Sequence, residues 1–261
     1  MSKFSIAEIE TKIRTIIDDH DPFILELEKD ERKGVQALLA KWKKRRDYER
    51  NLEAKFFEMA EFERKYREQG FKYIAGVDEV GRGPIAGPVV AAAVILPDDF
   101  FLPGIDDSKK LSEKKRLEYD EIIRKEALAV SISMVHAQEI DAINIYEAAK
   151  KAMLSSIASL KQKPDVLLID AMKLETPYIS ESIIKGDARS ISIAAASIIA
   201  KTARDQLMKE YGASMPNYGF EKHMGYGTKE HLQALKQYGI TPIHRKSFAP
   251  VKELVQTSVL K

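Results

Sequence analysis

The first 70 residues carry apolar side chains at helical spacing. Ser5 and Glu8 form the pattern of a capping box, and Asp21 before Pro22 is typical of an N-cap followed by a first-turn proline. The apolar positions that recur three or four residues apart include Ile9, Ile13, Ile16, Ile17, Val35, Leu38, Leu39 and Trp42. We therefore expect residues 1–70 to form a helical N-terminal extension.

From residue 71 the pattern changes to short β-prone runs that alternate with amphipathic stretches. The runs predict strands at 72–78, 88–96 and 127–135, one ending at Asp170, and one near 183–185. The amphipathic stretches predict helices at 113–126, 139–161, 190–211 and 228–238. Early strands followed by alternating helices and strands favour an α/β fold, a mixed sheet flanked by helices. We expect this domain to cover residues 71–261, with a helical and loop C-terminal subdomain from about residue 213.

Composition narrows the class of protein without naming its chemistry. The chain has 261 residues, 44% of them hydrophobic, which suits one core domain with an appendage. It contains no cysteine, so disulfides and thiolate metal sites are excluded. No secretory signal and no long apolar run stand out, and we expect a cytoplasmic protein without a membrane segment. The net charge of +2 gives little indication of a nucleic-acid partner.

Acidic residues at strand ends provide the first chemical signal. Asp78 and Glu79 close a β-prone run, Asp170 ends another, and Asp187 precedes a long run of small and apolar residues. A solvated turn would explain the first pair, and a helix N-cap would explain Asp187. However, four acids that meet at one sheet edge would resist ionisation unless a cation compensated them. Mg²⁺ and Mn²⁺ prefer oxygen ligands, so the four acids predict a site for two metal ions.

The glycines after this pair faintly resemble a dinucleotide-binding turn. That motif requires a helix directly after the glycines. Here Pro84 and Pro88 flank a turn that leads into a predicted strand, so we reject a nucleotide-binding reading. Gly81 and Gly83 lack Cβ atoms, and their backbone could approach a sugar closely. A tight turn that simply needs glycine is the alternative, but it leaves Arg82 between them unexplained.

Five motifs follow one another along the chain. They are Gly76-Val-Asp-Glu-Val-Gly-Arg-Gly-Pro-Ile-Ala-Gly-Pro88, Asp107-Ser-Lys-Lys-Leu111, Leu168-Ile-Asp170, Lys185-Gly-Asp187 and Gly225-Tyr-Gly227. Together, and in their order and spacing, they closely resemble the bacterial ribonuclease HII family. The resemblance covers roughly residues 71 to 245. We expect the preceding segment to lie outside the family core.

The resemblance implies a ribonuclease H-like fold and an endoribonuclease that acts on the RNA strand of RNA–DNA hybrids. It also implies incision 5′ to single ribonucleotides in duplex DNA, leaving 5′-phosphate and 3′-hydroxyl ends. Asp78, Glu79, Asp170 and Asp187 would be catalytic and would bind two Mn²⁺ or Mg²⁺ ions. The substrate-binding residues would be Gly81, Arg82, Gly83, Ser108, Lys109, Lys201 and Tyr226. We expect a monomer whose partners are these nucleic acids.

In this reading the individual substrate contacts differ in kind. Tyr226 would stack on the deoxyribose that follows the ribonucleotide, although an aromatic residue between glycines often only anchors a loop. Ser108 and Lys109 would bind a downstream phosphate. Lys201 would act similarly, with pairing to a nearby acid as its alternative. His223, His231 and His244 fit ordinary surface histidines better than cleft residues.

Two other functions are compatible with parts of the sequence. A ribonuclease HIII-type enzyme shares the carboxylates, but the Gly81–Gly83 turn, Tyr226 and a helical N-terminal extension argue against it. A non-catalytic hybrid-binding protein would be expected to lack one or more metal ligands. All four acids are present, so the enzyme is the favoured prediction.

Overall fold

The computed structural model describes residues 4–259, with side chains up to residue 256. The chain divides into two compact units, residues 1–57 and residues 58–261. The division falls inside a long helix, whereas the sequence suggested a boundary near residue 70. It lies earlier because the helix that follows, α4 (Glu61–Glu68), packs against the second unit through Phe62 and Tyr66.

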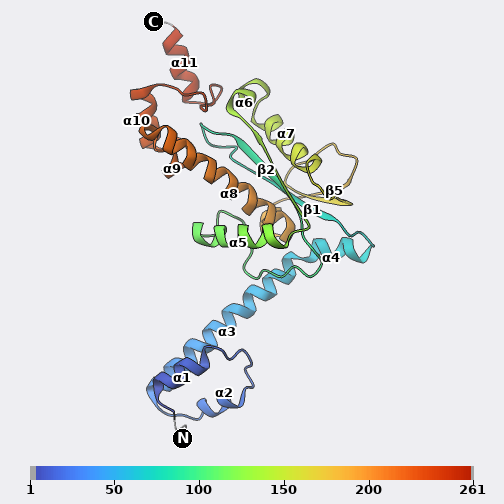
Figure 1. Ribbon diagram of the computed structural model, residues 1–261, viewed down its shortest axis with the longest axis vertical. Coiled ribbons are helices and arrows are strands. Elements are labelled where there is room, and N and C mark those ends of the chain that lie inside the picture. Colours follow the sequence, from blue (N-terminus) through green and yellow to red (C-terminus); the bar gives the residue numbers. More distant parts are fainter. Residues whose placement is uncertain (1–3, 260–261) are drawn as a thin grey trace. The chain divides into compact units, whose positions relative to one another are not determined.

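The first unit is built from three helices, labelled in Figure 1: α1 (Ile6–Ile13), α2 (Pro22–Leu27) and most of α3 (Lys33–Met59). Ser5 and Glu8 form the expected capping box, and the side chain of Asp21 accepts a hydrogen bond from the Phe23 amide as an N-cap. The core of the unit consists of Ile9, Ile13, Ile24, Leu27, Val35, Leu39 and Trp42. Local capping and apolar spacing therefore account for this unit.

The second unit contains a five-stranded mixed sheet. Its strands are β1 (Ile74–Val80), β2 (Val89–Ile95), β3 (Ala129–Val135), β4 (Val166–Asp170) and β5 (Ile179–Ile183), in the order β3-β2-β1-β4-β5. Strand β1 pairs antiparallel with β2 and parallel with β4. The two parallel strands β1 and β4 therefore end at the same edge, where both carry acidic residues. The fold class predicted from the sequence is confirmed.

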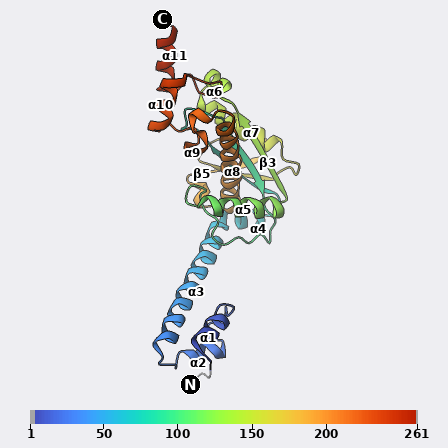
Figure 2. The same cartoon turned by 60° about the vertical axis from the view of Figure 1, so that its left-hand side comes forward.

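Helices cover both faces of this sheet (Figures 1 and 2). The remaining α-helices are α5 (Glu113–Glu126), α6 (Ala137–Ile143), α7 (Ile145–Ala158), α8 (Ile191–Ser214), α9 (Phe220–His223), α10 (Lys229–Tyr238) and α11 (Val251–Val259). Helix α7 packs on β2 and β3, while α8 packs on β1 and β2. At Gly76 the contact with α8 is close, since an added Cβ would lie 2.0 Å from the Ser192 carbonyl carbon.

Two predicted elements differ from the structure. The helix expected over 139–161 is two helices, because Asn144 takes a φ of 66° and caps the second with its side chain. The strand expected near 183–185 lies at 179–183. It is an edge strand with mostly exposed side chains, so it lacks the apolar run that marks buried strands. No helix in the described part of the chain is long and apolar enough to cross a bilayer.

Candidate active site

The acidic edge of the sheet brings together the four carboxylates that the sequence singled out. The register of β1 and β4 pairs Val77 with Ile169, so Asp78 and Asp170 are the next residues along two neighbouring parallel strands. Asp187 lies in a short 3₁₀ helix, Gly186–Ala188, that leads into α8. The Gly186 amide donates to Asp170 Oδ1 at 2.6 Å, which ties that short helix to the end of β4. The N-cap of α8 is Ser190, so the capping alternative for Asp187 is wrong.

Burial makes these carboxylates hard to ionise. Burial, with the negative charges of Glu79 and Asp170, raises the pKa of Asp78 well above its usual range. Burial also raises the pKa of Glu79, against the opposing charge of Arg82, and that of Asp170, against hydrogen bonds from two backbone amides. The pKa of Asp187 rises to about 6 through burial and the nearby Asp107 and Asp170.

The orientation of the carboxylates follows from strand geometry. Successive side chains on β1 point to opposite faces of the sheet. Asp78 accordingly faces α8, where the Ser197 hydroxyl hydrogen-bonds to it. Glu79 points the other way and pairs with Arg82, Oε1 to Nη1, at 3.2 Å. Across the residues with described side chains, no three acidic or histidine side chains stand close enough together to hold one metal ion.

The other half of the Glu79 carboxylate has a different environment. Its Oε2 atom is buried and has no hydrogen-bond partner among the described residues. A buried, unpaired carboxylate oxygen is costly unless a cation or donor completes it. The unpaired Glu79 Oε2 atom is therefore the feature of the acidic edge that best fits a bound cation.

Two loops that the sequence assigned to substrate lie side by side. A Cβ added at Gly83 would lie 3.7 Å from Cε1 of the half-exposed Tyr226 ring, an ordinary contact, and Gly83 does not have a positive φ. The fold therefore does not require glycine at this position. Gly81 differs, since its φ is +92° and an added Cβ would lie 2.3 Å from Arg204 Nε. Glycine at 81 is explained by the turn itself, and glycine at 83 is not.

The remaining predicted binding residues take several positions. The Ser108 hydroxyl is turned inward and lies 2.9 Å from that of Ser197, behind Asp78. The exposed Lys109 is held near the site by charge. Partial loss of hydration lowers the pKa of its ammonium group, but the attraction of Asp107, Asp78 and Asp187 outweighs that effect and raises the pKa. Lys201 Nζ binds Asp205 Oδ1 at 2.6 Å, the pairing given as its alternative.

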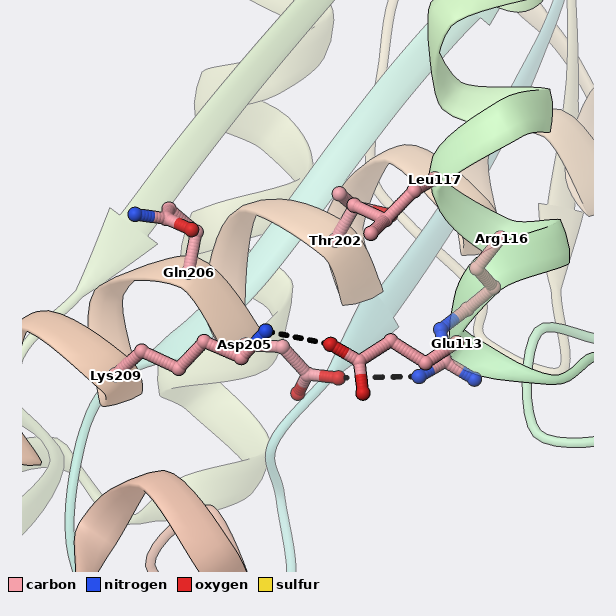
Figure 3. Close-up of a pocket in the computed structure, with 7 residues that line it drawn as sticks. All are labelled: Glu113, Arg116, Leu117, Thr202, Asp205, Gln206 and Lys209. Carbon is pink, nitrogen blue, oxygen red and sulfur yellow. Dashed lines mark hydrogen bonds and ion pairs between the residues drawn. The ribbon is translucent and has the colours of Figure 1, made fainter.

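A small cavity lies between α5 and α8 (Figure 3), and Arg116, one of the residues that line it, also contacts the Ser108–Lys109 loop. The Arg116 guanidinium donates to the carbonyls of Ser108 and Leu111, at 3.1 and 2.8 Å. It also lies 3.4 Å from Asp205, while Lys209 pairs with Glu113 across the same cavity (Figure 3). These ion pairs join the two helices beside the acidic edge, and the cavity is not lined by the four carboxylates.

The three histidines are buried, contrary to the surface prediction. His244 Nδ1 accepts from the Thr241 amide, so its Nε2 carries the proton and donates to His231 Nε2 at 3.0 Å. His231 in turn donates through Nδ1 to the carbonyl of Tyr226, at 2.8 Å. Burial lowers the pKa of His231 and of His244 to about 4. This neutral chain holds the Tyr226 loop rather than lining a cleft.

Other supporting residues gave no local sequence signal. Glu63 on α4 is 1% exposed and accepts from the hydroxyls of Ser190 and Ser192 and from the Ser192 amide at the start of α8. It thereby fixes the helix that follows Asp187. Asp107, at the start of the Asp107–Leu111 motif, is a further residue of the site, because its charge helps to raise the pKa of Asp187. Its position beside Ser108 and Lys109 could have indicated this.

Comparison with known proteins agrees with this geometry. Residues 75–251 match the family model for ribonuclease HII, and residues 5–67 match the model for the ribonuclease HII N-terminal domain. The first 70 residues lie outside the ribonuclease HII model itself, as expected, but they match a separate model for the family's N-terminal domain. The chain is 55% identical over 256 residues to ribonuclease HII of Bacillus cereus (strain G9842), covering 98% of this chain and all of that protein.

Solved structures of more distant relatives share this fold at lower sequence identity. Ribonuclease H2 from Pyrococcus horikoshii OT3 matches with a TM-score of 0.61 and 25% identity, over 72% of this chain and 100% of that one. Bst-RNase HIII in complex with Mn²⁺ shares the fold, with a TM-score of 0.54 and 16% identity over 73% of this chain and 71% of that one. The chain thus belongs to the ribonuclease HII family of metal-dependent endonucleases of the ribonuclease H type.

Proposed function

We propose that this ribonuclease H cleaves the RNA strand of RNA–DNA hybrids and also incises 5′ to single ribonucleotides in duplex DNA. The products would carry 5′-phosphate and 3′-hydroxyl ends. Asp78, Glu79, Asp170 and Asp187 would hold two divalent ions, Mg²⁺ or Mn²⁺. The observation that carries the single-ribonucleotide activity is the open surface over Gly83, beside Tyr226 and next to the acidic edge.

The donor set suits hard divalent cations. Four carboxylates with raised pKa values share one edge, and the buried Glu79 Oε2 atom has no partner among the described residues. Such acids ionise together when cations neutralise them. Two bound ions would activate the attacking water and stabilise the leaving oxygen of an in-line displacement. A relative of the same fold is described as a complex with Mn²⁺, in agreement with this donor set.

The chain's own residues would orient the carboxylates and take little direct part in proton transfer. Ser197 has one hydroxyl proton, which it gives to Asp78, so it accepts from Ser108. The Gly186 amide orients Asp170. His231 and His244 do not serve as general bases, because they are buried and their ring nitrogens are hydrogen-bonded to each other, to Thr241 and to the Tyr226 carbonyl.

Recognition of the ribonucleotide would depend on two adjoining loops. A ribose above Gly83 would contact only backbone atoms of that residue. The sugar of the next nucleotide could stack on the half-exposed Tyr226 ring. A site that hydrogen-bonds a 2′-hydroxyl rejects the deoxy sugar because its polar groups would be left unpaired. The Gly81–Gly83 turn and Tyr226 would therefore select the junction between a ribonucleotide and the deoxyribonucleotide after it.

The test is cleavage of a labelled DNA duplex that carries one ribonucleotide, with Mg²⁺ or Mn²⁺, by the wild type and by Asp78→Asn. We expect incision 5′ to the ribonucleotide by the wild type alone, since the substitution keeps the shape but removes a ligand charge. Cleavage of long hybrids without cleavage of this duplex would reject the junction proposal and favour a ribonuclease HIII-type activity. A folded protein that binds hybrids and cleaves neither substrate would favour the non-catalytic alternative.

A further inference from the structure

Two fully buried arginines lie behind the Gly81–Gly83 turn and the Tyr226 loop, and they donate hydrogen bonds only to backbone oxygens. Arg204 and Arg245 are each 0% exposed. In the described part of the chain neither forms an ion pair with a carboxylate, and all their hydrogen bonds go to carbonyl groups. Burial lowers the pKa of Arg245 to about 9, with Arg204 adding to the effect. Burying a guanidinium cation without a carboxylate partner is unfavourable. The hydrogen bonds of these arginines to backbone carbonyls therefore indicate a structural or functional role.

The contacts of Arg245 converge on the Gly81–Gly83 turn. Its Nη2 donates to the Gly81 carbonyl at 2.5 Å, its Nη1 to the Arg82 carbonyl at 2.9 Å, and its Nε to the Gly87 carbonyl at 3.0 Å. The guanidinium also lies over the Phe248 ring, 5.0 Å from the centroid. Three directional bonds and one stacked face hold this planar group in a single orientation.

These contacts determine where the turn's amide groups point. In a planar trans peptide the carbonyl and the following N–H point in opposite directions. Since the carbonyls of Gly81 and Arg82 point inward to Arg245, the N–H groups of Arg82 and Gly83 point outward. Both residues are exposed, and within residues 4–256 neither N–H has a hydrogen-bond acceptor. Two free donors therefore face the surface beside Tyr226.

We propose that Arg245 is a positioning residue for ribose recognition, which holds the Arg82 and Gly83 N–H groups ready for the sugar hydroxyl of the ribonucleotide. The inference deepens the proposed function and rests on it. Donors fixed in advance bind without the cost of ordering a flexible loop. Arg204 has a different task, since it binds the carbonyls of Ala86, Pro88 and Met224 and not those of Gly81 or Arg82.

The test compares affinities for two duplexes of one sequence, one with a single ribonucleotide and one entirely of DNA. Binding is measured with Ca²⁺, a hard oxygen-seeking cation that replaces Mg²⁺ or Mn²⁺ to limit cleavage. Arg245→Lys keeps a positive charge but cannot bind two carbonyls as a fork. We expect it to reduce the ribonucleotide-to-DNA affinity ratio about tenfold, the effect of one or two lost hydrogen bonds to the sugar, and to leave affinity for the DNA duplex nearly unchanged.

Arg67→Lys is the control, at an arginine that in addition pairs with Asp98, Nη1 to Oδ1, at 3.0 Å. Arg67 also binds two backbone carbonyls, those of Leu96 and Pro97, at 3.2 and 3.0 Å, away from the turn. If both variants change the ratio equally, or if Arg245→Lys weakens both duplexes equally, the role of Arg245 is only structural and the inference is overturned. A wild type without preference for the ribonucleotide duplex would reject the proposed recognition itself, and the inference with it.

A second measurement needs no substitution at Arg245. In hydrogen exchange of the wild type, the Arg82 and Gly83 amides should exchange fast in the free protein. They should become protected with the ribonucleotide duplex and not with the DNA duplex. Protection in the free protein, or equal protection by both duplexes, would contradict the outward orientation or its role. This result stands even if Arg245→Lys fails to fold.

Discussion

The two glycines of the substrate turn should respond to alanine in opposite ways. Gly81→Ala places a Cβ at a φ of +92°, 2.3 Å from Arg204 Nε and 2.7 Å from the Pro88 carbonyl oxygen. Gly83→Ala places a Cβ 3.7 Å from the Tyr226 ring, with no positive φ to oppose it. We expect the first change to reduce stability and the second to reduce activity on ribonucleotide junctions.

The magnitudes follow from these contacts. A non-glycine residue held at positive φ costs about 1–3 kcal/mol. Overpacking against a buried group costs about as much again, ~1–3 kcal/mol. For a unit of this size each kcal/mol lowers Tm by roughly 2–4 °C, so Gly81→Ala should lose on the order of 10 °C. Gly83→Ala makes only ordinary contacts, and its free energy of unfolding should stay within about 0.5 kcal/mol of wild type.

The assay combines thermal unfolding with steady-state cleavage of the single-ribonucleotide duplex. In Gly83→Ala the new methyl group occupies the space that the sugar would take, so kcat/KM should fall at least about tenfold, equal to ~1.4 kcal/mol. The Tm of the same variant should match the wild type. If Gly83→Ala cleaves the junction as the wild type does, the sugar does not approach the backbone here. If Gly81→Ala unfolds at the wild-type temperature, the packing argument is refuted.

Three further predictions concern the acids and the N-terminal helices. Asp187 has a folded-state pKa of about 6, above its unfolded value, so its ionisation destabilises the metal-free fold as pH rises through about 4 to 6. The Tm of Asp187→Asn should therefore rise relative to that of the wild type as the pH increases across that window, and Mn²⁺ should stabilise the wild type only. A Tm difference between the two proteins that does not change with pH would contradict this. Glu63→Gln removes the buried charge at the start of α8 and should lower stability by ~1–2 kcal/mol in urea unfolding, unless the cap contributes nothing. Deleting residues 1–57 should leave the Tm of the second unit within a few degrees of the wild type and the incision position unchanged. Deleting residues 1–70 also removes Glu63 and should lower the Tm clearly. Equal Tm values for the two deletions would show that α4 is dispensable.

Local features of the fold could be predicted from the sequence because their causes are local. Ser5, Asp21 and Ser112 cap helices where the sequence placed helix starts. Asp78 and Asp170 each close an apolar, β-prone run, and this pattern predicted that they share one edge of the sheet. The register of β1 and β4 places them side by side there. The break at Asn144 was missed because a single asparagine with positive φ does not interrupt the apolar spacing.

The supporting contacts of the site could not be predicted, because they join residues far apart in the chain. Glu63 reaches Ser190 across 127 residues, and Arg116 reaches Asp205 across 89. A buried arginine or histidine also looks like a surface residue by composition, since such side chains are mostly exposed. The sequence therefore predicted which acids lie at one edge of the sheet, but not which side chains hold the loops around them.

Arg245 reaches the carbonyl of Gly81 across 164 residues of sequence, a separation longer than the whole run of strands β1 to β5. During synthesis at 5–20 residues per second, roughly 8–30 s pass between the appearance of the turn and that of the side chain that fixes it. Strand β5 and the short helix that carries Asp187 are synthesised well before Arg245, so the sheet and its acidic edge can form before that side chain appears. The nascent chain thus builds the hydrolytic part of the enzyme before the element that we propose selects its substrate.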